Sequence, residues 1–285
     1  MVRVALIFDR IRWEEKALLA AARELNVDMI PIDAKDVFFE ITSDGNLVCK
    51  GADGALQRCV SYFRGLHIAA ILETFSLRVV NPFQVSLICG NKLLTTLALV
   101  KAGVPTPMTF VAFSVDGAMR ALNKLGLPAV LKPIIGSWGR MVSPLTDFMS
   151  SRALFETMSE MGPLYKIFYI QDMINKPQRD IRTFVIGDEV VAAIYRYAKE
   201  GEWRTNTARG GRAVPCPLTD ELVDISLKAA NAVGGGVLGV DIMESENGLL
   251  VHEVNSTIEF KNTVPVTGVD IPGLIIRYVK DLVRR

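Results

Sequence analysis

Residues 241–255 read D-I-M-E-S-E-N-G-L-L-V-H-E-V-N, two apolar strands joined by a turn. The stretch carries two carboxylates, Asp241 and Glu253, and one side-chain amide, Asn255. Side chains alternate between the two faces of a strand, so Glu253 and Asn255 share one face. Whether Asp241 joins them depends on the length of the turn.

Two turns are compatible with this sequence. A two-residue turn at Asn247-Gly248 would pair Asp241 with Val254 and leave Glu253 on the opposite face. A three-residue turn at 246–248, with the glycine in the left-handed conformation, would pair Asp241 with Glu253. We predict the second register, because it gathers two carboxylates and an amide oxygen on one face.

Oxygen ligands of this kind suit Mg²⁺. Magnesium that is held by one or two protein carboxylates usually shares its coordination shell with nucleotide phosphates. The stretch therefore predicts a magnesium site that serves a bound nucleotide.

The composition argues against several other classes of protein. A chain of 285 residues with 50% apolar content buries a large core, divided into two or three lobes. A net charge of +1 argues against a broad nucleic-acid footprint. The four cysteines lack zinc-ribbon spacing, and neither histidine has a triad-like partner nearby. We expect a cytoplasmic protein, because no signal peptide and no apolar run of membrane-spanning length is present.

The order of apolar segments predicts the α/β class. A strand at 2–8, a helix at about 14–25 and a strand at 27–32 alternate as they do around a small, mostly parallel sheet. We expect residues 1–89 to form this first α/β lobe. A helix at 91–102 follows, and V-P-T-P at 104–107 breaks the chain before the next lobe.

A glycine loop offers a phosphate site. In K-P-I-I-G-S-W-G-R, residues 132–140, Lys132 ends a strand and two glycines bracket a loop whose backbone N–H groups can surround phosphate oxygens. The loop is not a Walker A motif, and short glycine loops are common, so taken alone it is more simply an ordinary hairpin with a solvated lysine. Lys92, at the start of the helix at 91–102, would neutralise phosphate charge if it met Lys132 in one cleft.

Arginines and a polar loop surround the carboxylate stretch in the sequence. Arg182 and Arg196 lie on two strands of a predicted hairpin around Gly187-Asp188, where both can face the same side. Arginine is the preferred fork for carboxylate and phosphate, although a solvated basic loop explains residues 203–212 equally well. The run S-T-I-E-F-K-N-T at 256–263 would line a pocket beside the metal or form an ordinary polar loop.

The order of these signals resembles the ATP-grasp superfamily, in particular the carboxylate–amine ligases of the RimK and LysX type. Six motifs are similar to the amino-group carrier protein ligases of lysine and arginine biosynthesis: D-R-I-R-W-E-E-K, R-C-V-S-Y-F-R-G-L, K-P-I-I-G-S-W-G-R, Q-D-M-I-N-K-P-Q-R-D-I-R, N-T-A-R-G-G and E-V-N-S-T-I-E-F-K-N-T. The resemblance covers essentially the whole chain. It implies an ATP-grasp fold with a Rossmann-like pre-ATP-grasp lobe at 1–89, a central lobe at 90–170 and a C-terminal lobe at 171–285.

The resemblance also implies roles for individual positions, with ATP and two Mg²⁺ ions as cofactors. Nucleotide contacts fall to Lys92, Lys132, Gly136, Ser137, Trp138, Gly139, Arg140, Gln171, Asp172, Met173, Ile174, Asp180, Arg182 and Asn206, with the backbone of the strand at 171–174 bonding adenine. The metal ligands are Asp241, Glu253 and Asn255. Substrate contacts fall to Arg196, Thr207, Ala208, Ser256, Thr257, Ile258, Glu259, Phe260, Asn262 and Thr263. Arg196, Asn206 and Arg209 are the catalytic residues.

The implied reaction joins the α-amino group of α-aminoadipate to the side-chain carboxylate of the C-terminal Glu of a small, acidic, zinc-binding carrier protein, through an acyl phosphate. In this family Asn-Thr at the position of Asn262-Thr263 goes with α-aminoadipate, whereas Gly-Phe goes with glutamate, and some relatives accept both. We expect a homo-oligomer, a dimer or a tetramer.

Three alternatives remain at this point. The first keeps the ligase chemistry and uses glutamate, either on the carrier or on a protein C-terminus as RimK does. The second is an ATP-binding regulatory module without catalysis, which the intact Asp241, Glu253 and Asn255 set disfavours. The third, a dinucleotide oxidoreductase, lacks the G-x-G-x-x-G motif after the first strand.

Overall fold

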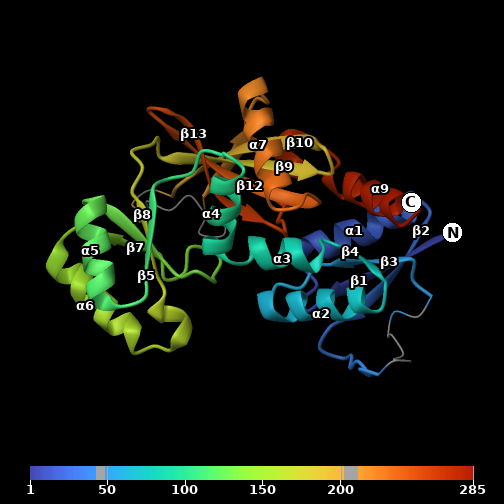
Figure 1. Cartoon of the computed structure of the whole chain (residues 1–285). Coiled ribbons are helices and arrows are strands. Elements are labelled where there is room, and N and C mark those ends of the chain that lie inside the picture. The colour runs from blue at the N-terminus through green and yellow to red at the C-terminus, as the bar shows by residue number, and fades with distance from the viewer. Residues whose placement is uncertain (43–48, 50, 200, 202–210, 285) are drawn as a thin grey trace.

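The computed structural model describes residues 1–42, 49, 51–199, 201 and 211–284, which form three sheets in succession along the chain (Figure 1). The first sheet is parallel, in the order β2-β1-β3-β4, as the strand–helix alternation predicts. Its strands are β1 (Val2–Phe8), β2 (Val27–Asp33), β3 (Gly54–Gln57) and β4 (Arg78–Val80), with helices α1 (Trp13–Glu24), α2 (Tyr62–Thr74) and α3 (Phe83–Cys89).

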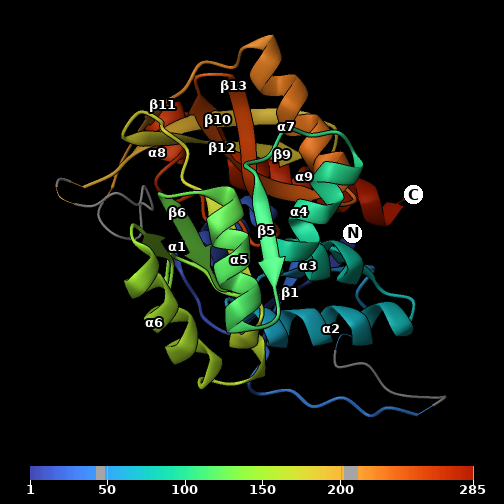
Figure 2. The same cartoon turned by 60° about the vertical axis from the view of Figure 1, so that its left-hand side comes forward.

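The central sheet is antiparallel, in the order β5-β8-β6-β7. Two helices lie side by side on its outer face and bury an apolar cluster around Phe155 and Phe168 (Figures 1 and 2). The elements are β5 (Thr109–Ala112), α5 (Val115–Leu125), β6 (Ala129–Lys132), β7 (Ser143–Leu145), α6 (Phe148–Ser159), the 3₁₀ turn η1 (Pro163–Lys166) and β8 (Phe168–Asp172).

The C-terminal sheet has five strands in the order β11-β10-β9-β12-β13. Helices α4 and α7 cover one face through Leu99, Leu222 and Ala229, while the other face packs toward the N-terminal sheet through Phe184 and Ile194. The elements are α4 (Lys92–Lys101), β9 (Arg179–Ile186), β10 (Glu189–Tyr197), β11 (Arg212–Pro215), α7 (Asp220–Ala232), β12 (Val237–Ser245), β13 (Gly248–Asn255) and α8 (Val264–Thr267).

The last helix returns to the beginning of the chain. Helix α9 (Ile271–Arg284) buries Ile275, Ile276 and Val279 in one core with Val4 and Leu18 of the N-terminal lobe. Both chain ends therefore lie on the same side of the molecule (Figure 1). Among the described residues, no single helix is long and apolar enough to cross a membrane, although the bent pair α3–α4 would pass by length and composition together.

The hairpin β12–β13 has the predicted outcome but not the predicted turn. The three-residue turn is wrong: Ser245 pairs with Gly248, so only two residues form the loop. Asp241 nevertheless pairs with Glu253, because the register shifts by one between Ile242 and Asp241. The extra residue of this β-bulge is His252. A two-residue turn with regular pairing would place Glu253 on the face opposite to Asp241. The one extra residue puts both carboxylates on the same face.

Asn81 joins the N-terminal lobe to the C-terminal sheet. Its buried amide donates to the carbonyl oxygens of Val237 and Ser256 at 2.7 Å each and accepts from the Val237 N–H at 2.8 Å. A side chain at Gly236, where φ is +115°, would collide with the Asn81 oxygen. The Asn81 amide thus bonds both backbone groups of Val237, the first residue of β12, as a neighbouring strand would. It also bonds Ser256, the residue directly after β13.

We predict that Asn81→Ala lowers the free energy of unfolding by about 2–4 kcal/mol, because three buried backbone groups lose their partner. Urea denaturation measures this change. Asn231→Ala, an exposed asparagine on α7, is the matched control and should change stability by less than about 0.5 kcal/mol. Equal effects of the two substitutions would contradict the joining role of Asn81.

Candidate active site

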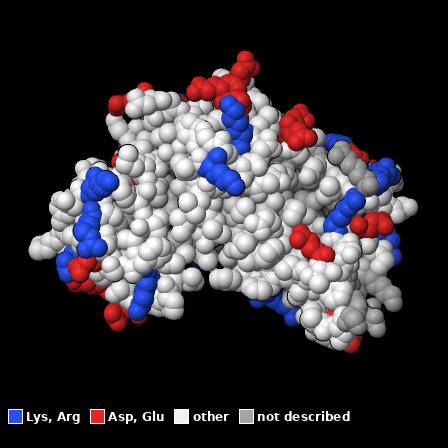
Figure 3. Space-filling model, in the orientation of Figure 1, with Lys and Arg blue, Asp and Glu red and all other residues white. Residues whose placement is uncertain are grey.

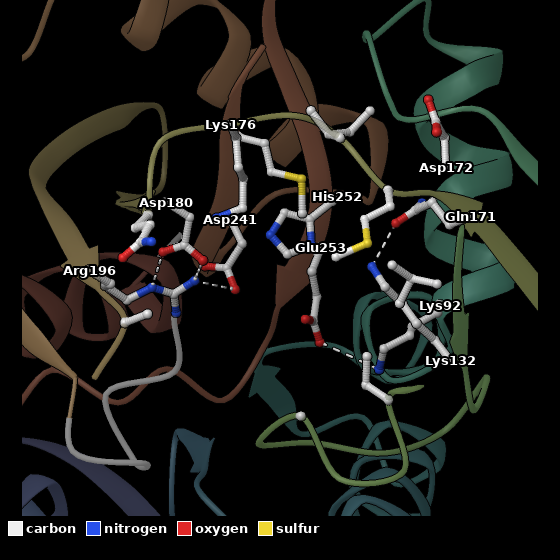
Figure 4. A pocket seen from close by; sticks show the side chains of 18 of the residues that line it. Lys92, Lys132, Gln171, Asp172, Lys176, Asp180, Arg196, Asp241, His252 and Glu253 are labelled. Carbon is white, nitrogen blue, oxygen red and sulfur yellow. Dashed lines mark hydrogen bonds and ion pairs between the residues drawn. The ribbon is translucent and has the colours of Figure 1, made fainter. Parts of the chain in front are cut away.

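A cleft of about 640 Å³ opens between the central and C-terminal sheets (Figure 4). Lysines from α4 and β6 stand on one side of it, and the carboxylates of β12 and β13 stand on the other. The cleft also collects the glycine loop and the end of β8. Residues that are distant in the sequence therefore line one space of the size of a nucleotide.

The two lysines have different environments. Lys92 is the first residue of α4, whose Asn91 cap bonds two backbone N–H groups, and its ammonium donates to the Gly136 carbonyl at 2.8 Å. Lys132 is buried at the end of β6 and donates to Gln171 Oε1 at 2.6 Å. Burial, and to a smaller extent Lys92, lowers the pKa of Lys132 to about 8, although Glu253 opposes the shift. Lys132 is therefore partly neutral near pH 8.

The predicted glycine loop at 136–140 and the predicted strand at 171–174 both line this cleft. All of Gly136, Ser137, Trp138, Gly139 and Arg140 contribute to its wall. Trp138 and Gly139 have positive φ values of 57° and 63°, and the Arg140 guanidinium stacks 4.8 Å from the Trp138 ring centre. The loop therefore turns through two left-handed residues at the wall of the cleft.

The end of β8 forms a further part of the wall, at Gln171, Asp172, Met173 and Ile174. The Gln171 side chain bonds Lys132, and the Asp172 N–H donates to the carbonyl of Met108, the residue before β5, at 2.9 Å. Strand pairing ends there, so Met173 and Ile174 are the positions of this stretch that lie beyond the ladder.

Four buried or half-buried charges form a network on β9, β10 and β12. Arg196 holds Asp180 with two bonds of 2.7 and 2.8 Å, and Arg182 holds Asp241 with two bonds of 2.6 Å. Arg196 also lies 3.1 Å from Asp241. Each of the two pairs is a direct cross-strand pair in the sheet register. We call Asp180, Arg182, Arg196 and Asp241 the Arg–Asp network.

The network favours the ionised forms of Asp241 and Arg196. Burial alone would raise the pKa of Asp241, but Arg182 and Arg196 outweigh it and lower that pKa well below 3.8. Burial would likewise lower the pKa of Arg196, but Asp180 and Asp241 outweigh it and raise the value. Two arginines and two aspartates compensate each other, so the network adds no net charge to the cleft.

The residues expected to hold magnesium have suitable donor chemistry. Glu253 faces Asp241 across the hairpin, and the Lys92 ammonium lies 3.7 Å from its carboxylate. Asn255 lines a neighbouring cavity together with Glu253, and its buried Nδ2 has no hydrogen-bond partner among the described residues. No three His, Cys, Asp or Glu residues of the described part converge, and Asp241 is already bonded by two guanidinium groups. Two carboxylates and an amide still suffice for an ion that takes its other ligands from phosphates and water.

The segment after β13 lines two smaller cavities. One, of about 230 Å³, is bordered by Ser256, Thr257 and Glu259, and the other, of about 270 Å³, by Glu259, Asn262 and Thr263. Arg12, Arg182 and Arg196 border both. The side chains of Ile258 and Phe260 are fully buried in the apolar core instead, where Phe260 packs against Trp13. These two residues anchor the segment, and its polar members border the cavities.

Four predicted site residues lie outside the described part of the chain: Asn206, Thr207, Ala208 and Arg209.

The lining residues that the sequence reasoning missed include His252 and Arg12. His252 lines the cleft with both ring nitrogens unbonded among the described residues, and burial lowers its pKa to about 4, so the ring is neutral at pH 7. Arg12 bonds Glu15 and lies 3.2 Å from Glu259 of the substrate segment. The R-x-x-E spacing at the start of a helix signals the Arg12–Glu15 pair, whereas no local pattern signals the bulge at His252.

Several charged residues of the site, among them Lys132, Arg196 and Asp241, are buried. On the face seen in Figure 3, charged side chains of both signs are scattered, and the surface over α3 and α4 is largely uncharged. The lower margin of this view is hollowed between the central and N-terminal lobes.

Known proteins are similar to this chain in both sequence and fold. Residues 89–279 match the RimK-like ATP-grasp domain, and residues 4–88 match the LysX preATP-grasp domain. The α-aminoadipate–LysW ligase LysX of Sulfurisphaera tokodaii is 38% identical over 284 residues, which are 99% of each chain. The glutamate–LysW ligase ArgX of Sulfolobus acidocaldarius is 33% identical over 284 residues, 98% of this chain and 99% of that protein. A crystal structure of a RimK domain ATP-grasp protein from Sphaerobacter thermophilus has a TM-score of 0.78 at 21% identity and covers 98% of this chain and 100% of its own.

Two sheets that enclose a cleft between lysines and carboxylates define an ATP-grasp enzyme, and the expected fold class is thereby confirmed. The chain belongs to the RimK-like ATP-grasp family of ATP-dependent ligases, with an N-terminal domain of the LysX type.

We predict that ATP binding near pH 8 takes up about half a proton, because an anionic phosphate beside Lys132 would raise a pKa that is about 8 in the free protein. Titration calorimetry in buffers of different ionisation enthalpy measures this uptake, which should vanish near pH 6.5. Lys132→Met should abolish the uptake, and Lys101→Met, an exposed lysine on α4, should preserve it. Unchanged uptake in Lys132→Met would remove the phosphate contact.

Proposed function

We propose that this protein ligates α-aminoadipate to a small acidic carrier protein. ATP would activate the side-chain carboxylate of the carrier's C-terminal Glu, and the α-amino group of α-aminoadipate would displace phosphate to form an isopeptide bond. The two full-length relatives described above act on a carrier named LysW, and the relative with the higher identity uses α-aminoadipate. The zinc-binding fold of the carrier, the cytoplasmic location and a homo-oligomeric state belong to the same proposal.

The observation that carries the proposal is the position of the segment 256–263. It borders two polar cavities that both reach Arg182 and Arg196, and it begins directly after the carboxylate strand. Asn262 and Thr263, the pair that goes with α-aminoadipate in the family, border the second of these cavities. α-Aminoadipate carries two carboxylates, for which arginine forks are the suitable partners.

The chemistry follows from the groups around the cleft. A carboxylate does not acylate an amine unaided, because oxide is a poor leaving group. Attack of a carboxylate oxygen on the γ-phosphorus of ATP breaks the bond to ADP and forms an acyl phosphate. The α-amino nitrogen then attacks the acyl carbon, phosphate departs with the C–O bond electrons, and the nitrogen loses a proton.

The chain's own residues would bind and orient the reactants. Lys92 and Lys132 would offset the negative charge on the transferring phosphoryl group, as preorganised cations do. The 136–140 loop would cover the phosphates, and the stretch 171–174 would border the adenine. Arg182 and Arg196, already fixed by the Arg–Asp network, would offer guanidinium N–H donors in fixed positions to the acidic substrate.

Asp241, Glu253 and Asn255 would hold magnesium, which would supply positive charge to offset the charge of the phosphates. Two ions fit the family pattern, and both would draw on these same three side chains. The catalytic roles of Asn206 and Arg209 and the substrate contacts of Thr207 and Ala208 remain predictions from the resemblance.

The carrier would approach the rim of the second cavity. Lys261 borders that cavity and is exposed, as are Arg10 and Lys16 on either side of Arg12 in the sequence. Cations at a rim accelerate the encounter with an acidic partner, and the effect weakens as salt screens them.

ADP release with purified carrier, in parallel with α-aminoadipate and with glutamate, tests the proposal. We expect α-aminoadipate to be preferred by at least about tenfold in kcat/KM, and the double change Asn262→Gly with Thr263→Phe to reduce that preference. The KM for ATP serves as the control for intact folding. Equal rates with the two amino acids would overturn the selectivity and favour the glutamate-using relative, whereas no ADP release with either would favour a regulatory module.

We predict that Glu253→Gln reduces turnover by at least about a hundredfold, because it removes a carboxylate from the predicted magnesium set. Glu246→Gln, an exposed glutamate in the turn of the same hairpin, is the matched control and should retain normal turnover. The measurement is ADP release over a range of Mg²⁺ concentrations. Near-normal activity of Glu253→Gln at every concentration would contradict the metal assignment.

A further inference from the structure

A chain of hydrogen bonds runs from Lys132 in the cleft to helix α4. Lys132 bonds Gln171 Oε1 at 2.6 Å, and Gln171 Nε2 bonds Tyr169 Oη at 2.9 Å and Thr109 Oγ1 at 3.0 Å. Tyr169 Oη in turn lies 2.8 Å from Thr96 Oγ1. Gln171 and Tyr169 are each 1% exposed, so water does not compete for these bonds.

The direction of every bond in this chain follows from Lys132. An ammonium group only donates, so Gln171 must turn its oxygen toward Lys132 and its NH₂ away. That NH₂ also only donates, so the hydroxyl oxygens of Tyr169 and Thr109 must accept. Tyr169 therefore donates its own proton to Thr96, and Thr109 donates to the Pro107 carbonyl at 2.9 Å.

The sheet register brings these side chains onto one face. Tyr169 and Gln171 are two residues apart on β8 and point the same way. Lys132 on β6 is the cross-strand partner of Tyr169, and it reaches Gln171 as a diagonal neighbour. On the other side of β8, Thr109 of β5 is the partner of Gln171.

The far end of the chain lies on the helix that carries the second lysine. Thr96 follows Lys92 by four residues on α4, which is about one helical turn. The hydrogen bonds therefore connect Lys132 on β6 with the element that begins at Lys92. These two elements are separated by a strand and a helix in the sequence.

We propose that Tyr169 is a positioning residue for phosphate binding: its hydroxyl, which Thr96 of α4 holds in place, keeps the Gln171 oxygen toward Lys132. The inference rests on the proposed function, in which both lysines contact the phosphates of ATP. Without the Tyr169 hydroxyl, Thr109 alone holds the Gln171 amide. A rotated amide presents NH₂ to the ammonium, and Lys132 is displaced from its position.

The test is the binding of ATP and of adenosine to the whole protein. Tyr169→Phe should raise the Kd for ATP about five- to tenfold, the effect of one buried hydrogen bond and its consequences, and leave the Kd for adenosine unchanged. Thr96→Val, which removes the acceptor of the Tyr169 proton, should act in the same direction. Thr95→Val is the matched control, because this neighbouring buried threonine donates to the Ile88 carbonyl outside the chain of bonds.

A second background isolates the route of the effect. In Lys132→Met, the change Tyr169→Phe should cause no further loss of ATP affinity, because no ammonium remains to be positioned. A further loss there, an equal loss for ATP and adenosine, or an unchanged Kd for ATP in Tyr169→Phe would overturn the positioning role. If Lys132→Met itself binds ATP normally, the phosphate contact of the proposed function fails; if only Lys132→Met weakens ATP binding, the positioning role alone fails.

Discussion

One extra residue in β13 determines which side chains face the cleft. A strand alternates with a period of two, so a two-residue turn followed by regular pairing would bury Glu253 with Val251 on the core face. The bulge at His252 reverses the alternation after Val251, which stays in the core. Glu253 then faces Asp241, and its carboxylate lies opposite the lysines on the other side of the cleft. The position of Glu253 in the cleft depends on this one-residue shift.

The Arg–Asp network makes the resulting cluster of charges stable in a buried place. Each aspartate is bonded by an arginine of the neighbouring strand. Because the two residues of each ion pair are also cross-strand partners, pairing of the strands already brings their side chains together. Removal of one partner from such a pair typically costs about 3–5 kcal/mol, because the other charge stays buried. The same bonds fix the guanidinium groups that border the two smaller cavities. The same ion pairs therefore stabilise the sheet and hold the two guanidinium groups in fixed positions.

The sequence allows much of this structure to be predicted, and the exceptions have identifiable causes. Alternation and turn residues located the parallel N-terminal sheet and the β9–β10 hairpin. Helix α6 escaped notice because its apolar residues Phe148 and Met149 are exposed and obscure the helical period. The bulge at His252 and the bond from Lys132 to Gln171 depend on which strands are neighbours in a sheet. Such pairings are tertiary facts, and no local window of sequence contains them.

The segment that would choose the amino acid is built by two parts of the chain. Its backbone is held from the N-terminal lobe, where Asn81 bonds the Ser256 carbonyl and Arg58 bonds the Ile258 carbonyl at 2.8 Å. Its side chains belong to the C-terminal half. A change of substrate would thus depend on both parts of the chain. The C-terminal half supplies the side chains of the segment, and the N-terminal lobe fixes the conformation of its backbone. If the C-terminal halves of two relatives were exchanged, the side chains of this segment would move with them. The N-terminal residues that bond the backbone of the segment would not.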